Sequence, residues 1–400
     1  MMPRWGLVLL TVAVCAGQAP VWRDPSPHRV QFVTVEPNIR LEVLDWGGSG
    51  PPLVLLAGAG NTAHVFDGLA PKLTALAHVY GITRRGFGAS SAPLLGYSAN
   101  QLGNDVLAVL DVLRIDRPVL AGHSIAGEEM SSIGTRHPEK VTGLIYLDAA
   151  YRYAYYDPIL GNLEIDSLYL DRALRQLAAE SPAISRDQKE FHQLMKDRFA
   201  ADTSKEEVPV VRRLMESVMP KMENDLRGLP ATALRQALLE KDIPRVKEEL
   251  WKRQEVLRSA AEPPKDPVPT AADVANFPAI HAWALRVNGF AAPEAELRQQ
   301  FAVRPNGGIG PQRDTSAIVD LMLDGMQKYA AVRVPVLALY SLPPKHDSPD
   351  SAEDEAQAAA FEKAMPSARV VRVPRADHYL FLSNESDVIR EMRAFLGSLR

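Results

Sequence analysis

The amino-acid sequence predicts an α/β fold, in which a mainly parallel sheet carries helices on both faces. Short apolar runs alternate with longer segments of helical spacing over residues 29–150, and again over residues 333–400. Continuous apolar runs are typical of strands buried on both faces of a parallel sheet, and their alternation with helices indicates βαβ units. Between these stretches, residues 151–332 are rich in charged, amphipathic segments, which predicts an inserted helical unit.

Length and composition are those of an ordinary globular protein. The chain has 400 residues, of which 46% are hydrophobic and 24% are charged. This length exceeds that of a typical single domain, so we expect one large core with an accessory unit. The formal net charge of -4 gives no electrostatic reason to expect nucleic acid as a partner, and a small-molecule substrate is expected instead.

The N-terminus has the pattern of an export signal. Arg4 precedes an apolar segment at residues 5–16, and a polar, proline-rich stretch follows. This order predicts a signal peptide over residues 1–20, a periplasmic or secreted mature chain, and no stable membrane span after its removal. The single cysteine, Cys15, lies inside the signal, so the mature chain would form no disulfide. Lipid anchoring at Cys15 is not expected, because the bulky Val14 precedes it.

The first half of the chain predicts a β-hairpin followed by βαβ units. Two segments rich in β-branched residues flank Glu36-Pro37-Asn38, which is typical of a hairpin turn. Buried strands then alternate with amphipathic helices up to residue 147. The expected strands are residues 29–35, 39–44, 53–56, 78–83, 119–120 and 141–147, and the expected helices are residues 63–77 and 102–113.

The second half predicts the insertion and then a return to the α/β pattern. Residues 151–332 contain few strand candidates, and their proline-rich stretches are interpreted as loops because helical spacing resumes after each. The second part of the sheet therefore follows the insertion. The amphipathic runs include residues 168–177, 208–219 and 245–257; the later strands are expected at 334–339 and 369–373, and the later helices at 352–365 and 385–396.

A small-residue corner follows the apolar run that ends at Leu120. It reads Gly122-His123-Ser124-Ile125-Ala126-Gly127 and leads into a helix-forming segment. A serine on a tight strand-to-helix turn of this kind has its hydroxyl clear of the sheet, and small neighbours allow the turn. Ser124 is therefore the candidate nucleophile, although Ala126 stands where the G-x-S-x-G pattern has glycine.

A serine nucleophile needs a histidine to accept its proton and a carboxylate to hold that histidine. His378 follows the last predicted strand, at the carboxyl edge of the sheet, and is the candidate base. Two aspartates compete for the acid. Asp148 ends the strand at 141–147 and is slightly favoured, whereas Asp347 lies late in the loop after the strand at 334–339. Asp350 and Asp377 are further alternatives.

The developing oxyanion of an acyl-transfer reaction needs fixed backbone donors. The N–H of Ile125 follows the candidate nucleophile, and the N–H of Ala59 lies in the small-residue loop Gly58-Ala59-Gly60. This loop lacks the third glycine of a dinucleotide fingerprint and the lysine of a P-loop, so phosphate binding is not favoured.

Taken together, these motifs resemble the α/β-hydrolase superfamily over residues 29–150 and 333–400. The resemblance is carried by the loop at 58–60, Arg85-Gly86-Phe87-Gly88-Ala89-Ser90, the corner at 122–127 and Asp377-His378. It implies an α/β-hydrolase fold with residues 151–332 as a helical cap. It also implies that Ser124 is the nucleophile, that His378 is the base, and that Ala59 and Ile125 supply the oxyanion hole.

Two features depart from or refine that pattern. The first loop has Ala57 where the family usually shows histidine. The strand end at Asp148 resembles members, such as haloalkane dehalogenases, whose acid follows this earlier strand. Those enzymes use an aspartate nucleophile, so Ser124 argues against dehalogenation and epoxide opening.

Together with the N-terminal pattern, the resemblance implies an exported serine hydrolase, carboxylesterase-like, which acts on a small ester without a metal or organic cofactor. Fold alone does not settle function, and two alternatives stay open. One is a lyase, peroxidase-like enzyme or carbon–carbon bond hydrolase that uses the same triad. The other is a small-molecule receptor whose hydrolase site has no significant turnover.

Overall fold

The structure, a computed structural model, describes residues 22–201, 203–259, 267–330, 332–342 and 351–399. The predicted signal peptide with Cys15, and the alternative acids Asp347 and Asp350, lie outside the described residues. Among the helices that are described, none is both long enough and apolar enough to cross a lipid bilayer.

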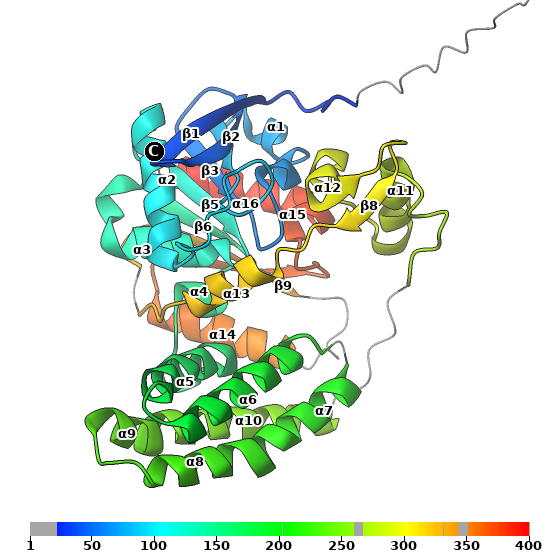
Figure 1. The fold of residues 1–400 in the computed structure, drawn as a ribbon. Helices are drawn as coiled ribbons and strands as arrows, with labels where there is room; N and C mark the ends of the chain where they lie inside the picture. The colour runs from blue at the N-terminus through cyan, green and yellow to red at the C-terminus, as the bar shows by residue number, and fades with distance from the viewer. Residues whose placement is uncertain (1–21, 202, 260–266, 331, 343–350, 400) are drawn as a thin grey trace, which may run out of the picture.

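An eight-stranded sheet lies at the centre of the fold (Figure 1). Its order is β1-β2-β4-β3-β5-β6-β9-β10. The β1–β2 and β2–β4 pairs are antiparallel and every other neighbouring pair is parallel, which confirms the predicted α/β class. The strands are β1 (Arg29–Glu36), β2 (Ile39–Gly47), β3 (Pro52–Leu56), β4 (His78–Ile82), β5 (Val119–His123), β6 (Gly143–Leu147), β9 (Val336–Leu342) and β10 (Arg369–Pro374).

Helices cover both faces of this sheet. Consecutive residues of a strand point to opposite faces, so each strand contributes side chains to both apolar layers. Leu120 and Leu144 pack with α2, α3 and α14 on one face, whereas Ala121 and Ile145 pack with η1, α1, α15 and α16 on the other. Each face therefore has its own apolar layer. The helices are η1 (Ala63–Phe66), α1 (Ala70–Leu73), α2 (Ala99–Leu113), α3 (Ala126–Arg136), η2 (Pro138–Lys140), α14 (Ser351–Ala364), α15 (Leu380–Ser383) and α16 (Glu385–Ser398).

The single helix predicted over residues 63–77 is wrong. The segment forms a 3-10 turn, η1, and a short helix, α1, which begins one residue before Pro71. Proline has no N–H to donate and its ring clashes with the carbonyl four residues earlier, so it is favoured in the first turn of a helix, and α1 begins there. The apolar residues of this segment are mostly buried, as a helical spacing predicts, but the hydrogen-bonded helix is interrupted.

The first part of the segment at 151–332 forms a helical unit with its own hydrophobic core. We call α5 to α10 the bundle; Figure 1 shows it in green, on one side of the molecule, away from the sheet. Its buried side chains include Phe191, Met222 and Leu250, and they belong to a separate cluster from the sheet layers. After α4 (Tyr151–Ala154), the bundle comprises α5 (Leu163–Ala178), α6 (Pro182–Phe199), α7 (Ser204–Arg213), the π-helical turn η3 (Leu214–Val218), α8 (Met219–Arg227), α9 (Ala233–Ala237), the π-helical turn η4 (Leu238–Asp242) and α10 (Ile243–Ser259).

The second part of the same segment contacts the sheet domain directly. Glu296 on α12 is fully buried and accepts hydrogen bonds from Asn61 Nδ2 at 3.0 Å and from the N–H of Thr62 at 3.1 Å. This part also contains a hairpin that the sequence analysis did not predict, since strands of three and four residues are too short to show alternation. It comprises α11 (Phe277–Asn288), α12 (Glu294–Gln300), β7 (Phe301–Val303), β8 (Ile309–Gln312) and α13 (Ser316–Asp324).

The close approach of α3 to the end of β6 makes a prediction about Gly127. A methyl group at this position would lie 2.4 Å from the backbone oxygen of Ala149. Alanine normally stabilises a helix by about 1 kcal/mol relative to glycine, but overpacking costs about 1–3 kcal/mol. We expect Gly127→Ala to lower the free energy of unfolding in denaturant titrations. The control Gly397→Ala, on α16 with nothing within 4 Å of the added methyl, should raise it. A Gly127→Ala variant as stable as the parent would contradict this packing.

Candidate active site

Ser124 lies on a strained turn between β5 and α3. Its φ is +53°, in the left-handed region that non-glycine residues rarely adopt. The turn is closed by hydrogen bonds from the N–H of Ser124 to the carbonyl of Leu147 at 3.3 Å, and from the N–H of Gly127 to the carbonyl of Ser124 at 2.9 Å. A methyl group at Gly122 would lie 3.0 Å from Cβ of Ala126, so the corner requires small residues on both sides. The predicted strand-turn-helix context of Ser124 is present.

Asp148 occupies the equivalent position one strand further along the sheet. The parallel register pairs His123 of β5 with Leu147 of β6, so Ser124 and Asp148 follow paired residues at the same edge. Asp148 also has a left-handed backbone, with φ of +49°.

The structure brings His378 and Asp148 together. Nδ1 of His378 lies 2.7 Å from Oδ2 of Asp148. Ser341 on β9 donates to the same carboxylate twice, from its N–H and from its hydroxyl, at 2.8 Å each. Asp377 does not take this place: it is exposed and accepts a hydrogen bond from the N–H of Tyr379 at 3.0 Å. Among the described aspartates considered for the acid, Asp148 is thus the one in contact with the His378 ring.

The Asp148 carboxylate is charged although it is only 1% exposed. Burial by itself would raise its pKa, but the hydrogen bonds from His378 and Ser341 favour the ionised form, and the pKa of Asp148 is held below its ordinary value. A carboxylate in this state can orient the imidazole of His378 and stabilise it when it becomes charged. Sequence reasoning missed Ser341, because the strand was expected to end at residue 339.

His123 positions the chain around His378. Its ring centroid lies 4.5 Å from that of His378, and its Nε2 is 3.0 Å from the carbonyl oxygen of His378. A carbonyl only accepts hydrogen bonds, so Nε2 carries the proton. Burial, together with the nearby His378, lowers the pKa of His123 to about 3. His123 is therefore neutral at physiological pH and is a structural neighbour rather than a base.

The loop with the second candidate oxyanion donor lies directly against the turn of Ser124. A methyl group at Gly58 would lie 3.2 Å from Cβ of Ser124 and 2.7 Å from Nδ1 of His123, so only glycine fits there. Ala59 and Ile125 pack in the same apolar cluster. Among the hydrogen bonds between described residues, none uses the N–H of Ala59 or of Ile125 as donor. Both N–H groups are thus available to a ligand.

A buried ion pair fixes this loop, and sequence reasoning missed it. Arg84 follows β4 and pairs with Glu129 on α3 through two hydrogen bonds of 2.9 Å. The same guanidinium donates to the carbonyl oxygens of Ala57 at 2.7 Å and Gly58 at 3.4 Å. Bidentate arginine–carboxylate pairs have a defined geometry, so Arg84 holds the loop carbonyls in place and thereby orients the following N–H groups.

Apolar side chains from the insertion and the sheet domain surround the candidate oxyanion donors. The cluster that contains Ile125 and Ala59 also includes Phe87, Tyr153 and Met322. The candidate oxyanion donors therefore lie against a buried apolar cluster.

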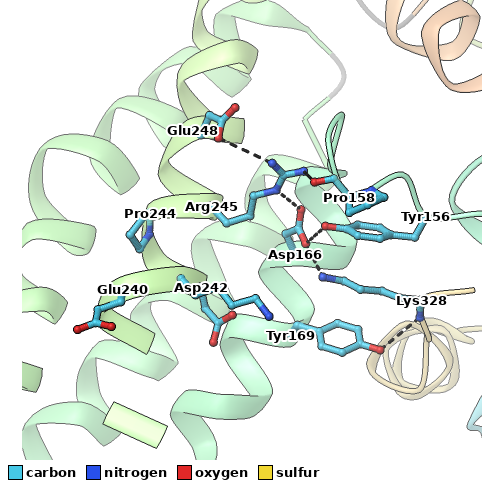
Figure 2. A pocket seen from close by; sticks show the side chains of 11 residues that line it. Tyr156, Pro158, Asp166, Tyr169, Glu240, Asp242, Pro244, Arg245, Glu248 and Lys328 are labelled. Atoms are coloured by element: carbon cyan, nitrogen blue, oxygen red, sulfur yellow. Dashed lines mark hydrogen bonds and ion pairs between the residues drawn. The ribbon is translucent and has the colours of Figure 1, made fainter. Parts of the chain in front are cut away.

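A different cavity of about 490 Å³ lies between α5, the start of α10 and the segment after α13 (Figure 2). Asp166 accepts a hydrogen bond there from the Tyr156 hydroxyl at 2.7 Å and pairs with Lys328 at 2.7 Å and Arg245 at 3.3 Å. The cavity is lined by none of the candidate catalytic or oxyanion residues. This cavity is therefore not the candidate active site.

A family model described as "Alpha/beta hydrolase family" matches residues 53–262, more than half of the chain. The chain belongs to the alpha/beta hydrolase family. In this alpha/beta hydrolase, the matched residues include the loop at Ala59, Ser124 and Asp148, whereas His378 lies beyond the match.

Curated relatives match only part of this alpha/beta hydrolase. An uncharacterized protein of Mycobacterium tuberculosis is 32% identical over 127 residues, which are 32% of this chain and 37% of that protein. The 2-(acetamidomethylene)succinate hydrolase of Mesorhizobium japonicum is 27% identical over 121 residues, or 30% of this chain and 42% of that enzyme. The chain thus spans less than half the length of these relatives.

A solved structure of E-2-(acetamidomethylene)succinate hydrolase matches with a TM-score of 0.53 and 17% sequence identity. The match covers 92% of this chain and 99% of that structure. Identity at this level shows the shared alpha/beta hydrolase fold alone.

The neutral His123 makes a prediction about pH dependence. The unfolded chain protonates this side chain near pH 6.5, whereas the folded chain does so only near pH 3, so acid destabilises the folded state through this group. As pH falls from 6.5 to about 4, the free energy of unfolding of the parent should fall faster than that of His123→Gln, by up to about 1.4 kcal/mol per pH unit. Denaturant titrations at several pH values measure both slopes. Parallel curves for the two proteins would show that His123 is not buried in the neutral form.

Proposed function

We propose that this protein is a serine hydrolase that cleaves a small carboxylic ester through an acyl-enzyme on Ser124. The observation that carries the proposal is the 2.7 Å contact between His378 Nδ1 and Asp148 Oδ2, at the sheet edge where Ser124 follows the neighbouring strand with a left-handed backbone. This pairing leaves Nε2 of His378 as the ring nitrogen that can serve Ser124. The family membership and a relative named as a hydrolase support hydrolysis as the reaction class.

The first half of the proposed reaction forms the acyl-enzyme. Nε2 of His378 accepts the hydroxyl proton as the oxygen of Ser124 attacks the ester carbonyl. The N–H groups of Ala59 and Ile125 stabilise the negative charge that develops on the carbonyl oxygen. The tetrahedral intermediate then collapses, the bond to the alkoxide oxygen breaks, and His378 returns its proton to the departing alcohol. Asp148 stays ionised and stabilises the imidazolium.

The second half releases the acid. A water molecule gives a proton to His378 and attacks the acyl carbonyl, and the same two N–H groups stabilise the new oxyanion. Collapse of this intermediate breaks the bond to Ser124, which recovers its proton from His378. The products are one carboxylic acid and one alcohol for each ester and water consumed.

Two features support a small ester as the substrate. The cluster with Phe87, Tyr153 and Met322 places the proposed oxyanion donors in apolar surroundings, where fixed donors stabilise a developing charge most effectively. Ser124 at the turn favours acyl transfer over dehalogenation or epoxide opening, for which the related enzymes use an aspartate nucleophile.

The proposal predicts that Ser124 is the covalent nucleophile. A fluorophosphonate probe should label Ser124, as detected by mass spectrometry of the digested protein, and the parent should hydrolyse p-nitrophenyl esters of short acids. Ser124→Ala should abolish both labelling and turnover. An active protein that is labelled at another residue would contradict the proposal. Binding of esters without turnover would favour the alternative function as a receptor.

The choice of acid is tested by a matched pair of amide substitutions. Replacing the carboxylate of a serine triad by an amide lowers kcat about 10⁴-fold in a well-studied protease, because the histidine is held in the wrong tautomer. Asp148→Asn should show a loss of this order in p-nitrophenyl ester turnover. The control Asp347→Asn should change the rate less than about tenfold. The reverse ranking would make Asp347 the acid, and unfolding titrations of both variants show whether the fold is retained.

Export is a further part of the proposal. The apolar segment at residues 5–16 behind Arg4 supports removal of about the first 17 to 20 residues during secretion. N-terminal sequencing of the protein from its native host should find a first residue just beyond this point. A soluble form in the cytoplasm that retains Met1 or Met2 would contradict export.

A further inference from the structure

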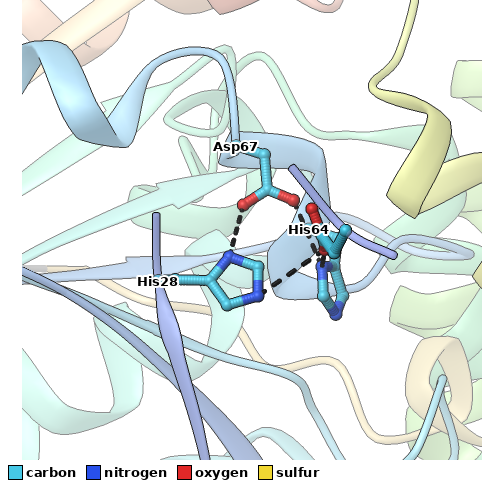
Figure 3. Close-up of side chains that lie close together, drawn as sticks. His28, His64 and Asp67 are labelled. Carbon is cyan, nitrogen blue, oxygen red and sulfur yellow. Dashed lines mark hydrogen bonds and ion pairs between the residues drawn. The ribbon is translucent and has the colours of Figure 1, made fainter. Parts of the chain in front are cut away.

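Four side chains with metal-ligating groups lie together on the edge of the sheet domain where β1 begins (Figure 3). Asp24 and His28 come from the segment just before β1, and His64 and Asp67 come from η1 and the residue that ends it. One ligand atom from each lies within 4.8 Å of all the others. None of the four belongs to the proposed catalytic machinery.

We propose that Asp24, His28, His64 and Asp67 form a structural zinc site. Two histidines and two aspartates supply four nitrogen and oxygen ligands, which is the number that a closed tetrahedral zinc site takes. Calcium and magnesium prefer six or more oxygen ligands or retained water, so a set with two imidazoles favours zinc.

The spacing of the ligand atoms fits a tetrahedral ion. With zinc–ligand distances of about 2.0–2.2 Å, neighbouring ligand atoms of a tetrahedron lie roughly 3.3–3.6 Å apart. Nδ1 of His64 lies 3.2 Å from Oδ2 of Asp24 and 3.2 Å from Oδ2 of Asp67. Nε2 of His28 lies 3.6 Å from Oδ2 of Asp24. Nδ1 of His64 is thus at tetrahedral spacing from both aspartates, and a turn of the His28 ring would complete the set of four.

An outer partner is already in place for one of the two imidazoles. Metal-bound histidines usually donate their second ring N–H to a carboxylate or carbonyl, which fixes the ring. Nδ1 of His28 is 2.9 Å from Oδ1 of Asp67, a contact between two of the proposed ligands, so the His28 ring must turn for one of its nitrogens to reach the ion. Nε2 of His64 faces Oε1 of the buried Glu42 at 3.6 Å. The ring of His64 therefore has a carboxylate on the side away from the proposed ion.

The Asp67 carboxylate is also held by hydrogen bonds, at the oxygen that does not face His64. Its Oδ1 accepts hydrogen bonds from the Ser26 hydroxyl at 2.7 Å and from Trp46 Nε1 at 3.2 Å, so its Oδ2 is the oxygen turned toward His64. A ligand carboxylate that is held by hydrogen bonds at its other oxygen is typical of metal sites.

The charge of the cluster also favours a cation. Asp24, Asp67 and Glu42 bring three carboxylates together, and within the described chain their ion pairs are all with His28 and His64. Buried carboxylates are normally paired with a full positive charge or coordinate a metal. The Asp24 side chain is 21% exposed, which gives an ion a path from solvent.

A zinc ion here would connect the segment before β1 to η1. The loop with the proposed oxyanion donor Ala59 ends where η1 begins, so the ion would restrain the residues that follow this loop. Such a site has no open coordination position and takes no part in the reaction. It would stabilise the fold by joining residues that are about 40 positions apart in the sequence.

The test uses the full chain, stripped of metal with a chelator and then titrated with zinc sulfate. We expect one zinc ion per chain by calorimetry and by elemental analysis, and a rise of several degrees in Tm at saturating zinc. Cobalt in place of zinc should give the intense visible absorption of four-coordinate Co²⁺. Absence of binding, or the weak spectrum of six-coordinate cobalt, would overturn the proposal.

Variants locate the ion. Asp24→Asn and His28→Gln should each weaken zinc binding more than about 100-fold and remove the rise in Tm, whereas Glu42→Gln should weaken it by about 10- to 100-fold. The matched control is His78→Gln, since His78 pairs with Asp45 at 2.8 Å outside the cluster, and it should bind zinc like the parent. Asp24 is partly exposed, so its variant is the one expected to fold normally.

Equal zinc affinity in the parent, Asp24→Asn and His28→Gln would place the ion elsewhere and overturn the site. The cluster would then be an ion network around a protonated His64. Burial opposes that charge, but hydrogen bonds to Asp67 and Glu42 raise the pKa of His64 to about 10.

Discussion

The hydrogen bond between His378 and Asp148 depends on a negative charge that lies almost entirely out of water. An isolated buried carboxylate would take up a proton, so this one is ionised only because three donors converge on it. His378 supplies one donor and Ser341 supplies two. Ser341 can reach this carboxylate because β6 and β9 are neighbours in the sheet. The backbone of Asp148 itself has a left-handed conformation.

The same sheet edge determines which residues can act together. Paired residues of β5 and β6 end at the same level, so the positions that follow them are adjacent whatever their identity. The loop with Ala59 is then held from several sides, by Arg84 through its carbonyls, by Glu296 at Asn61 and Thr62, and by the Tyr379 hydroxyl, which donates to Asn61 at 3.0 Å. Donors that are fixed before charge develops are the kind that stabilise an oxyanion most effectively.

Much of this organisation could be predicted from local sequence. Buried strands of a parallel sheet appear as continuous apolar runs, and the small residues around Ser124 are required by the close contacts at Gly122. The position of His378 after the last strand followed from the same logic.

Other features depend on contacts between distant segments, which local patterns do not contain. The helix expected at residues 63–77 is broken by Pro71 although its apolar spacing is helical. The pair Arg84 and Glu129 joins residues 45 positions apart. Asp24 and His28 show only a spacing common in any loop, and their proximity to His64 is set by the way the N-terminal segment crosses the sheet edge.

The division of the long insertion into two parts has a consequence for how this protein can change. Helices α6 to α10 keep their buried apolar side chains in a cluster of the bundle's own, whereas Ile165 on α5 packs with Ile125, and α12 is joined to the loop beside the candidate site through Glu296. Effects of substitutions at sites that share no contacts are additive. Replacements in α6 to α10 can therefore accumulate with little influence on the sheet, and replacements on α5 or α12 cannot. Over evolutionary time, α6 to α10 are the part free to diverge, and α12 is expected to change together with the loop it holds.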